Sequence, residues 1–476
     1  MVLNAFLSET LDFTYKKRYN PFRSDSMLVE FKVGNFLSFN ETQTFSMKAG
    51  KYRNYSDRLY CSSKNKLVKF MSIYGANASG KSNLVSSFAF FKNLIVRGYK
   101  NGSCPYYCKL RDDNKKKESL FEIKIEIENK VFVYGFKCIL NTSSFTEEWL
   151  YEELKSGSKR NVFYRDISNE KITIGTYINS QSLKKHIKMY GNDLNRETPI
   201  LFLKYMNQYK DGLYENNNKA LVFKSVYNWI KYKLYVNFDE RPITNYSWLI
   251  DHDNLDEIAE KLNAFSIGIE KISVKNIASE KFSMEIPKEN VDEIHKMLND
   301  LKIGKKNEKN IKTPALLIRT PKNSMFMINI NDEGEFEYKT LEFKHKNSNA
   351  RFSLGEESDG TVRLLDIIEI LLNHNDDMVY IVDEINRMFH PLLTCKFVNE
   401  FLSLAIDRNI QLIVTTHESQ LMNLKMLRKD EINFVNKNDI GYSSICSLMK
   451  YDDRFDKKIV NEYFNGKYDA IPIFEE

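Results

Sequence analysis

The chain has 476 residues, enough for two or three folding units, and its 42% hydrophobic content suffices for well-packed cores. No stretch approaches the ~20 apolar residues of a membrane-spanning helix, which disfavours a membrane-inserted protein. The net charge of +6 arises from 70 basic and 64 acidic residues, and this near balance disfavours a protein dedicated to coating DNA.

The first 26 residues are predicted to form an N-terminal extension. Met1–Leu7 lacks the basic start and the long apolar centre of a secretory signal peptide. A strand pattern begins near Met27 and leads into the segment Asn35-Phe36-Leu37-Ser38-Phe39. We therefore place the start of the first domain at Met27.

A complete phosphate-binding loop of the form G-x-x-x-x-G-K-[ST] follows, with the residues Gly75-Ala76-Asn77-Ala78-Ser79-Gly80-Lys81-Ser82. An apolar strand pattern over 70–74 precedes the loop, and helical spacing over 84–97 follows it, which is the context that this motif requires. Loop N–H groups and the helix N-terminus, where Asn83 lies, favour bound phosphate. Lys81 is predicted to meet the outer phosphates, and the Ser82 hydroxyl to ligate Mg²⁺. The sequence therefore predicts a nucleoside triphosphate site.

The residues after this loop predict an antiparallel β lobe. Alternating runs over 121–128 and 131–136 are separated by Asn129-Lys130, which indicates a hairpin, and 147–154 adds another strand. The one close cysteine pair, Cys104 and Cys108, has no second pair or nearby histidine that would complete a zinc site. Reduced thiols are typical of the cytosol, so we expect a cytoplasmic protein.

Between about residues 182 and 301 the pattern becomes mainly helical. Residues 221–236, for example, place apolar and aromatic side chains at helical spacing. No heptad pattern extends over three repeats, so we expect a compact helical arm rather than a long coiled coil. Strand patterns return over 324–330 and 336–343.

A second candidate anion site follows these strands. Ser358-Asp-Gly360-Thr361 forms a glycine turn, and apolar residues at helical spacing continue over 362–372. A helix N-terminus after a glycine turn favours an anion.

Two further strand patterns end in residues that suit catalysis. The apolar run 378–382 ends in Asp383-Glu384, the form of a Walker B strand. Asp383 is predicted to hold Mg²⁺ through water, and Glu384 to polarise the attacking water. A third apolar run, over 411–416, ends in His417.

The order of these motifs resembles that of ABC-type ATPases. The Ser-Asp-Gly-Thr signature, with His390-Pro391 after the acidic pair, departs from the Ser-Gly-Gly-Gln form of the transporters. It is similar to the soluble branch with the SMC-like repair ATPases, RecF, and the OLD, RloA, PtuA and AriA-like ATPases of bacterial antiphage defence. Asn35–Phe39 resembles the opening segment of that branch, and Tyr463–Pro472 resembles the Gly-Arg-Tyr-Gly-Ala-Ile-Pro ending of the RloA-like group.

The resemblance implies an α/β fold with a P-loop ABC-type ATPase core, an antiparallel β lobe and an inserted helical domain. We place the first part of the core at 27–180, the insertion at 181–320 and the second part of the core at 321–476. The resemblance further implies that ATP and Mg²⁺ are bound, that Glu384 and His417 are catalytic, and that His417 contacts the γ-phosphate. Ser358 and Gly360 are then expected to close over ATP bound to a second protomer.

These roles imply a homodimer, or a higher homo-oligomer, of protomers joined head-to-tail by ATP. About 59 residues follow His417, too few for the Toprim nuclease domain of OLD-type proteins. The resemblance to the RloA and PtuA arrangement then implies a separate effector, a Toprim-like or HNH nuclease, and a phage-derived trigger protein. The alternative that the resemblance leaves open is a RecF- or SMC-like ATPase of DNA maintenance. Lysine-rich runs at 115–117, 184–188 and 302–312 are typical of solvated loops or helix faces, and they permit nucleic-acid binding without establishing it.

Overall fold

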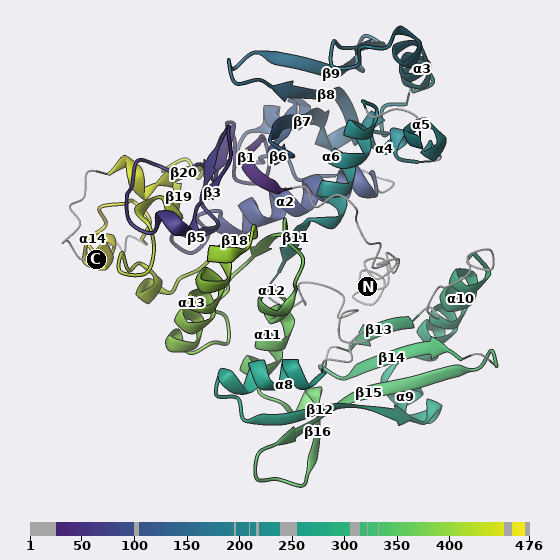
Figure 1. Ribbon diagram of the computed structural model, residues 1–476, viewed down its shortest axis with the longest axis vertical. Helices are drawn as coiled ribbons and strands as arrows, with labels where there is room; N and C mark the ends of the chain where they lie inside the picture. Colours follow the sequence, from purple (N-terminus) through teal and green to yellow (C-terminus); the bar gives the residue numbers. More distant parts are fainter. Residues whose placement is uncertain are drawn as a thin grey trace. The chain divides into compact units, whose positions relative to one another are not determined.

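The computed structural model describes residues 25–99, 104–194, 197–208, 210–215, 219–238, 255–304, 315–320, 322–331, 333–451 and 459–471. They fall into two compact units (Figure 1). The larger unit takes the described residues of 24–239, 374–386 and 394–476, and the smaller unit those of 240–373 and 387–393. Nearly all of the predicted N-terminal extension, and Pro472 of the predicted tail motif, lie outside the described residues.

A six-stranded sheet forms one layer of the larger unit. Its order is β11-β17-β18-β5-β19-β20, with β20 antiparallel to its neighbour and the other strands parallel. The strands are β5 (Phe70–Tyr74), β11 (Leu234–Asn237), β17 (Val379–Val382), β18 (Gln411–Thr415), β19 (Ile432–Lys437) and β20 (Ser443–Ser447). Every residue of β5, β17 and β18 is buried, as expected for parallel strands covered on both faces.

A seven-stranded antiparallel sheet forms the second layer, in the order β10-β9-β8-β7-β6-β1-β2. The strands are β1 (Ser26–Gly34), β2 (Gln43–Ser46), β6 (Ser119–Ile127), β7 (Lys130–Ile139), β8 (Ser144–Glu153), β9 (Lys159–Asp166) and β10 (Lys171–Ile174). The predicted hairpin is confirmed, since β6 and β7 pair in register, but its two-residue turn is Glu128-Asn129, one residue earlier than the predicted Asn129-Lys130. Both turn residues have positive φ, which suits the right-handed twist of a tight hairpin.

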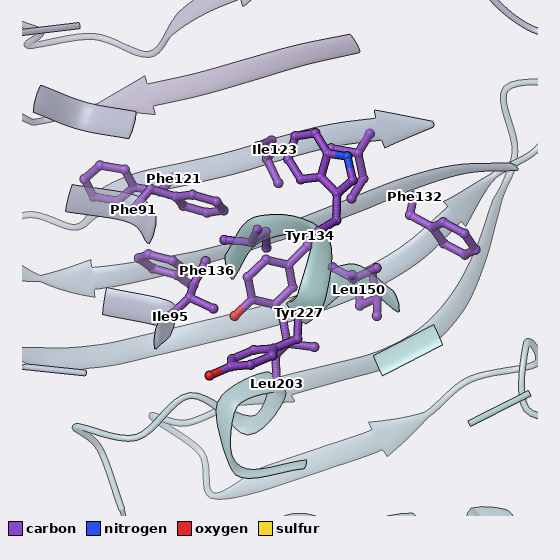
Figure 2. Close-up of a cluster of buried hydrophobic side chains, with 14 of the residues drawn as sticks. Phe91, Ile95, Phe121, Ile123, Phe132, Tyr134, Phe136, Leu150, Leu203 and Tyr227 are labelled. Atoms are coloured by element: carbon purple, nitrogen blue, oxygen red, sulfur yellow. The ribbon is translucent and has the colours of Figure 1, made fainter. Parts of the chain in front are cut away.

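Helix α2 (Lys81–Val96) joins the two layers. Its Phe88 ring stacks on Phe31 of β1 at 4.0 Å, and its Phe91 ring stacks on Phe136 of β7 at 5.6 Å. Figure 2 shows Phe91 and Ile95 pointing toward side chains of the antiparallel strands. Apolar residues at helical spacing along α2 thus fix the phosphate loop, which precedes this helix, to a core of aromatic side chains.

Residues 181–238 also belong to the larger unit. Helices α3 (Gln181–Asn192), α4 (Phe202–Met206), α5 (Asp211–Glu215) and α6 (Leu221–Tyr232) lie there, and Phe202 and Phe223 pack against Phe163 of β9. The helix predicted over 221–236 is wrong at its end. The chain leaves the helix after Tyr232 and forms β11, because its backbone pairs with β17 along the sheet edge.

The smaller unit contains a five-stranded antiparallel sheet in the order β12-β15-β14-β13, with β16 paired to β15. Its strands are β12 (Ile269–Ile277), β13 (Ala315–Arg319), β14 (Met325–Ile330), β15 (Phe336–His345) and β16 (Arg351–Ser353). Its helices are α8 (Leu255–Ala264), α9 (Ser279–Glu285), α10 (Lys288–Gly304), α11 (Asp359–Ile367) and α12 (Glu369–Leu372). Phe282 and Ile294 of the helices pack on Phe326 and Ile328 of the sheet.

The structure divides the chain differently from the predicted bounds. The segment 181–320 is distributed over both units: α3 to α6 complete the core of the larger unit, whereas α8 to α10 lie with the strands of the smaller one. The remaining elements are the short pair β3 (Tyr60–Cys61) and β4 (Lys66–Leu67), helix α13 (Pro391–Asp407) and helix α14 (Ile459–Phe464). In the described part of the chain, no helix is both long and apolar enough to cross a membrane.

Candidate nucleotide-binding site

The phosphate loop runs from the end of β5 to the start of α2. A Cβ on Gly75 would press against the Val435 carbonyl and the Ser79 hydroxyl. Gly80 has φ 113°, and a Cβ there would meet the Ser443 hydroxyl. Only glycine fits either position, and the loop backbone can therefore approach a phosphate closely.

Lys81 lies inside the loop and is only 5% exposed. Its Nζ donates to the carbonyls of Gly75 at 2.9 Å and Ala76 at 3.0 Å. Burial lowers the pKa of Lys81, while the carboxylates of Glu384 and Asp383 act in the opposite direction. The ammonium is therefore held between the loop and the acidic pair, where it can meet the outer phosphates.

Ser79 supplies a test of whether a phosphate fits the loop. The side chain is 2% exposed, and its Oγ has no hydrogen-bond partner within the described residues. A buried hydroxyl without a partner is costly, and a phosphate oxygen in the loop would accept its hydrogen bond. Together with the two glycines, this donor fits a bound phosphate chain.

The acidic pair lies at the end of β17. Thr415, the last residue of β18, donates from Oγ1 to Asp383 Oδ1 at 2.6 Å and accepts from the Glu384 N–H at 2.8 Å. The Asp383 N–H donates to the Asn237 carbonyl of β11 at 2.9 Å. The backbone of Glu384 has φ 47°, a conformation that residues other than glycine rarely adopt. Neighbouring strands thus hold both carboxylates in one arrangement.

His417 follows β18 by two residues. Its N–H donates to Asn386 Oδ1 at 3.3 Å, and the Thr416 hydroxyl donates to the same oxygen at 3.0 Å. The side chain is exposed, yet surrounding protein atoms desolvate the imidazolium and lower the pKa of His417, and the charge of Lys81 lowers it further. His417 therefore lies within electrostatic reach of Lys81.

The topology of the sheet explains why the acidic pair, His417 and the phosphate loop lie close together. Strands β17, β18 and β5 are parallel neighbours, with Val382 opposite Val414 and Val414 opposite Ser72. Their carboxyl ends face one edge, so the acidic pair, His417 and the phosphate loop emerge together. Asp383 and the exposed Ser82 hydroxyl at the first turn of α2 offer the oxygen ligands that Mg²⁺ prefers.

The contacts that hold the site join residues that the sequence had singled out to others that it had not. Asn83 was among the predicted nucleotide-binding residues. Asn83 Nδ2 donates to Ser38 Oγ at 2.7 Å, and Ser443 Oγ lies 2.7 Å from the same oxygen and also contacts the Ser79 carbonyl. Ser38 lies in the opening segment that the motif comparison emphasised, whereas nothing in the sequence around Ser443 marks it. The sequence likewise did not indicate the roles of Thr415 and Asn386, although Thr415 lies in the predicted strand that leads to His417.

The signature residues belong to the smaller unit. Ser358 caps α11, with its Oγ accepting from the Thr361 N–H at 3.1 Å. A Cβ on Gly360 would lie 3.1 Å from the Met388 carbonyl of the same unit. Within one chain, the structure thus brings Lys81, Asp383, Glu384 and His417 together in the larger unit, while Ser358 and Gly360 lie in the other.

Comparisons with known proteins give a family for the chain. Residues 70–423 match the family described as "AAA domain, putative AbiEii toxin, Type IV TA system". No curated protein matches the sequence.

Several solved structures share a weak likeness to this chain. One is the SMC head domain from Thermotoga maritima, with 11% identity over 88% of this chain and 98% of that one and a TM-score of 0.34. Another is an SmcHead bound to the C-winged helix domain of ScpA, with 14% identity over 89% and 99% of the two chains and a TM-score of 0.36. A third is an Smc head domain with an extended coiled coil bound to the C-terminal domain of ScpA derived from Pyrococcus furiosus, with 16% identity over 92% and 100% and a TM-score of 0.35. The family match, by contrast, spans well over half of the sequence and includes the phosphate loop, the acidic pair and His417. The chain belongs to this family of AAA-domain proteins, whose members are nucleotide-binding P-loop ATPases.

Proposed function

We propose that the chain binds and hydrolyses ATP with Mg²⁺ and uses this cycle to control a separate toxic effector in antiphage defence. The observation that carries the ATPase assignment is the convergence of Lys81, Asp383, Glu384 and His417 on one edge of the parallel sheet. The family description names a toxin of type IV toxin–antitoxin systems, which supports a role in controlling toxicity.

Each residue has a chemical task in this proposal. Loop N–H groups and Lys81 bind the β- and γ-phosphates, while Ser82 and Asp383 hold Mg²⁺, which neutralises phosphate charge when it is bound. Glu384 orients and polarises the attacking water and accepts its proton, because it is the carboxylate next to the metal-binding Asp383. His417 contacts the γ-phosphate and is the second catalytic residue beside Glu384.

The placement of the signature in the smaller unit supports a shared active site. We propose that two protomers dock head-to-tail, with Ser358 and Gly360 of one closing over ATP bound to the other. Mixing Lys81→Ala protein with Ser358→Arg protein should then restore part of the turnover, since one composite site of the mixed dimer is intact. Failure of every mixture, with both variants folded and exchanging subunits, would contradict the shared site.

The effector is expected to be a separate protein, a Toprim-like or HNH nuclease, released or activated by a phage-derived trigger. The test is co-expression with the protein encoded by the adjacent open reading frame, followed by mass measurement of the purified complex with ATP and with ADP. Expression of the chain alone should be non-toxic. Degradation of DNA or RNA by the purified chain alone, with Mg²⁺ or Mn²⁺, would contradict a separate effector.

A second candidate is a DNA-maintenance ATPase, and one observation favours it. Residues 181–238 contain ten basic and four acidic residues, so this segment carries as much net charge as the whole chain. The ammonium of Lys210 lies over the rings of Tyr190 at 4.2 Å and Tyr205 at 5.0 Å. Lysines suit the phosphates of a nucleic acid, and tyrosine rings suit stacking on its bases. ATP turnover by the purified chain that rises severalfold with duplex DNA would favour this candidate.

A further inference from the structure

The C-terminal segment 459–471 packs beside the residue that leads into the phosphate loop. Tyr468 is fully buried, and its ring stacks on Phe434 of β19 at 4.8 Å. The Tyr463 ring lies 6.1 Å from that of Phe434 and 6.1 Å from that of Tyr74, the last residue of β5. The segment thus joins an aromatic cluster that ends at the base of the loop.

Polar contacts fix this segment to the same strand. Asn436 of β19 donates from Nδ2 to the Tyr468 carbonyl at 2.9 Å. Tyr463 donates from its hydroxyl to the Ala470 carbonyl at 3.3 Å, which closes the segment on itself. Between Phe434 and Asn436 lies Val435, whose carbonyl faces Gly75 of the phosphate loop. One strand therefore carries the C-terminal segment on its side chains and borders the loop with its backbone.

Tyr74 connects the loop to the segment that contains His417. Its backbone continues directly into Gly75, while its hydroxyl donates to the carbonyl of Glu418 at 3.3 Å. Tyr74 is fully buried, so removal of its hydroxyl leaves the Glu418 carbonyl without this donor. Glu418 is the residue after His417, and a shift of its carbonyl would move the histidine relative to the loop.

We propose that the C-terminal segment and Tyr74 form a positioning device that holds His417 in place against the phosphate loop. Tyr463 packs beside the Tyr74 ring, and Tyr468 stacks on Phe434, whose ring lies 6.3 Å from that of Tyr74. The Tyr74 hydroxyl in turn fixes the backbone beside His417. The device acts on the hydrolytic step rather than on nucleotide affinity, because the Tyr74 hydroxyl donates its hydrogen bond to the His417 segment and not to the loop residues that cradle phosphate. This inference rests on the ATPase activity proposed above.

The test begins with Tyr74→Phe, which keeps the ring in the aromatic cluster and removes only the hydrogen bond. We expect kcat for ATP to fall about three- to tenfold, as loss of one such bond implies, while affinity for a fluorescent ATP analogue stays within about twofold. Tyr214→Phe is the matched control, since Tyr214 is a buried tyrosine whose hydroxyl donates to the Met206 carbonyl at 2.7 Å, away from the site. It should leave kcat unchanged.

A double-mutant cycle with His417→Ala separates positioning from general destabilisation. If Tyr74 acts through the histidine, Tyr74→Phe should lower kcat no further in the His417→Ala background. A full additional loss there would overturn the inference, as would an unchanged kcat for Tyr74→Phe alone.

The C-terminal half of the device is tested at Tyr468. Tyr468→Ala removes the ring and should lower kcat, with no further loss when it is combined with His417→Ala. Tyr468→Phe keeps the ring and should lower kcat less. If the alanine variant does not fold, Tyr74→Phe remains decisive. Equal kcat for the folded alanine and phenylalanine variants would overturn the role of the segment. A wild-type protein that hydrolyses no ATP in any assembly would overturn the proposed function and this inference together, whereas an active wild type with an unaffected Tyr74→Phe variant would overturn the inference alone.

Discussion

The phosphate loop and the acidic edge of the same site are built in opposite ways. The loop is one run of consecutive residues, 75–82, whose shape follows from its own glycines and from the helix that begins at Lys81. The edge is assembled from side chains of separate strands, with Asp383 and Glu384 held by Thr415. Nucleotide binding should therefore depend mainly on a local segment, and hydrolysis on the pairing of β17 with β18.

The largest effect is expected at the acidic edge. Glu384→Gln keeps size and hydrogen bonding but cannot accept a proton from water, so ATP turnover should fall about 10²-fold or more while ATP binding persists. Phosphate release and calorimetry measure the two quantities. Glu289→Gln, at an exposed position of α10, is the matched control. Wild-type turnover in Glu384→Gln would remove the catalytic role from this residue.

A change in the loop is expected to affect ATP binding itself. Lys81→Ala removes the ammonium that meets the outer phosphates, so ATP affinity should fall by roughly an order of magnitude or more. Lys115→Ala, an exposed lysine elsewhere in the larger unit, should leave affinity unchanged. Calorimetric titration with ATP checks both variants, and unchanged affinity for Lys81→Ala would show that the loop is not the phosphate site.

Thr415→Val tests whether strand pairing organises the edge. The variant keeps the shape of the fully buried side chain but leaves Asp383 Oδ1 and the Glu384 N–H without this partner. We expect kcat to fall about tenfold and the free energy of unfolding to fall by about 1–3 kcal/mol.

The control for this variant is another buried threonine. Thr394 is fully buried, and its Oγ1 has no hydrogen-bond partner among the residues that the structure describes. Thr394→Val should therefore leave kcat unchanged and stability unchanged or slightly raised. Equal losses in the two variants, measured by turnover and by chemical denaturation, would mean that Thr415 contributes only packing.

The smallest expected effect is the pH dependence that His417 adds. Its pKa is lowered in the folded chain, so the unfolded chain takes up a proton on this residue first as pH falls below about 6.5. The free energy of unfolding should therefore decrease as pH falls through that value. The contribution of His417 should stop changing once the pH lies below its pKa in the folded chain. His417→Gln should flatten the change in Tm between about pH 5 and 7. An identical slope in wild type and variant would contradict the shift.

The predicted strands and helices can be compared with the observed ones element by element. The strands predicted over 70–74, 378–382 and 411–416 lie within one residue of β5, β17 and β18, because buried parallel strands are short apolar runs that composition alone reveals. The helix predicted over 362–372 is present but broken into α11 and α12 at Ile368. The strand β11 was missed because its four residues continue a helical pattern, and only pairing with β17 makes them extended.

By itself, the sequence determined the phosphate loop, the acidic pair and the order of the main strands, since each depends on residues that are neighbours along the chain. The tertiary structure decided which strands stand side by side, and with them the contacts of Thr415 to Asp383 and of Tyr74 to Glu418. It also decided that Tyr468, near the end of the described chain, packs beside the strand that borders the loop. Such contacts join residues up to several hundred positions apart, and no local pattern encodes which of many similar polar or aromatic side chains will meet.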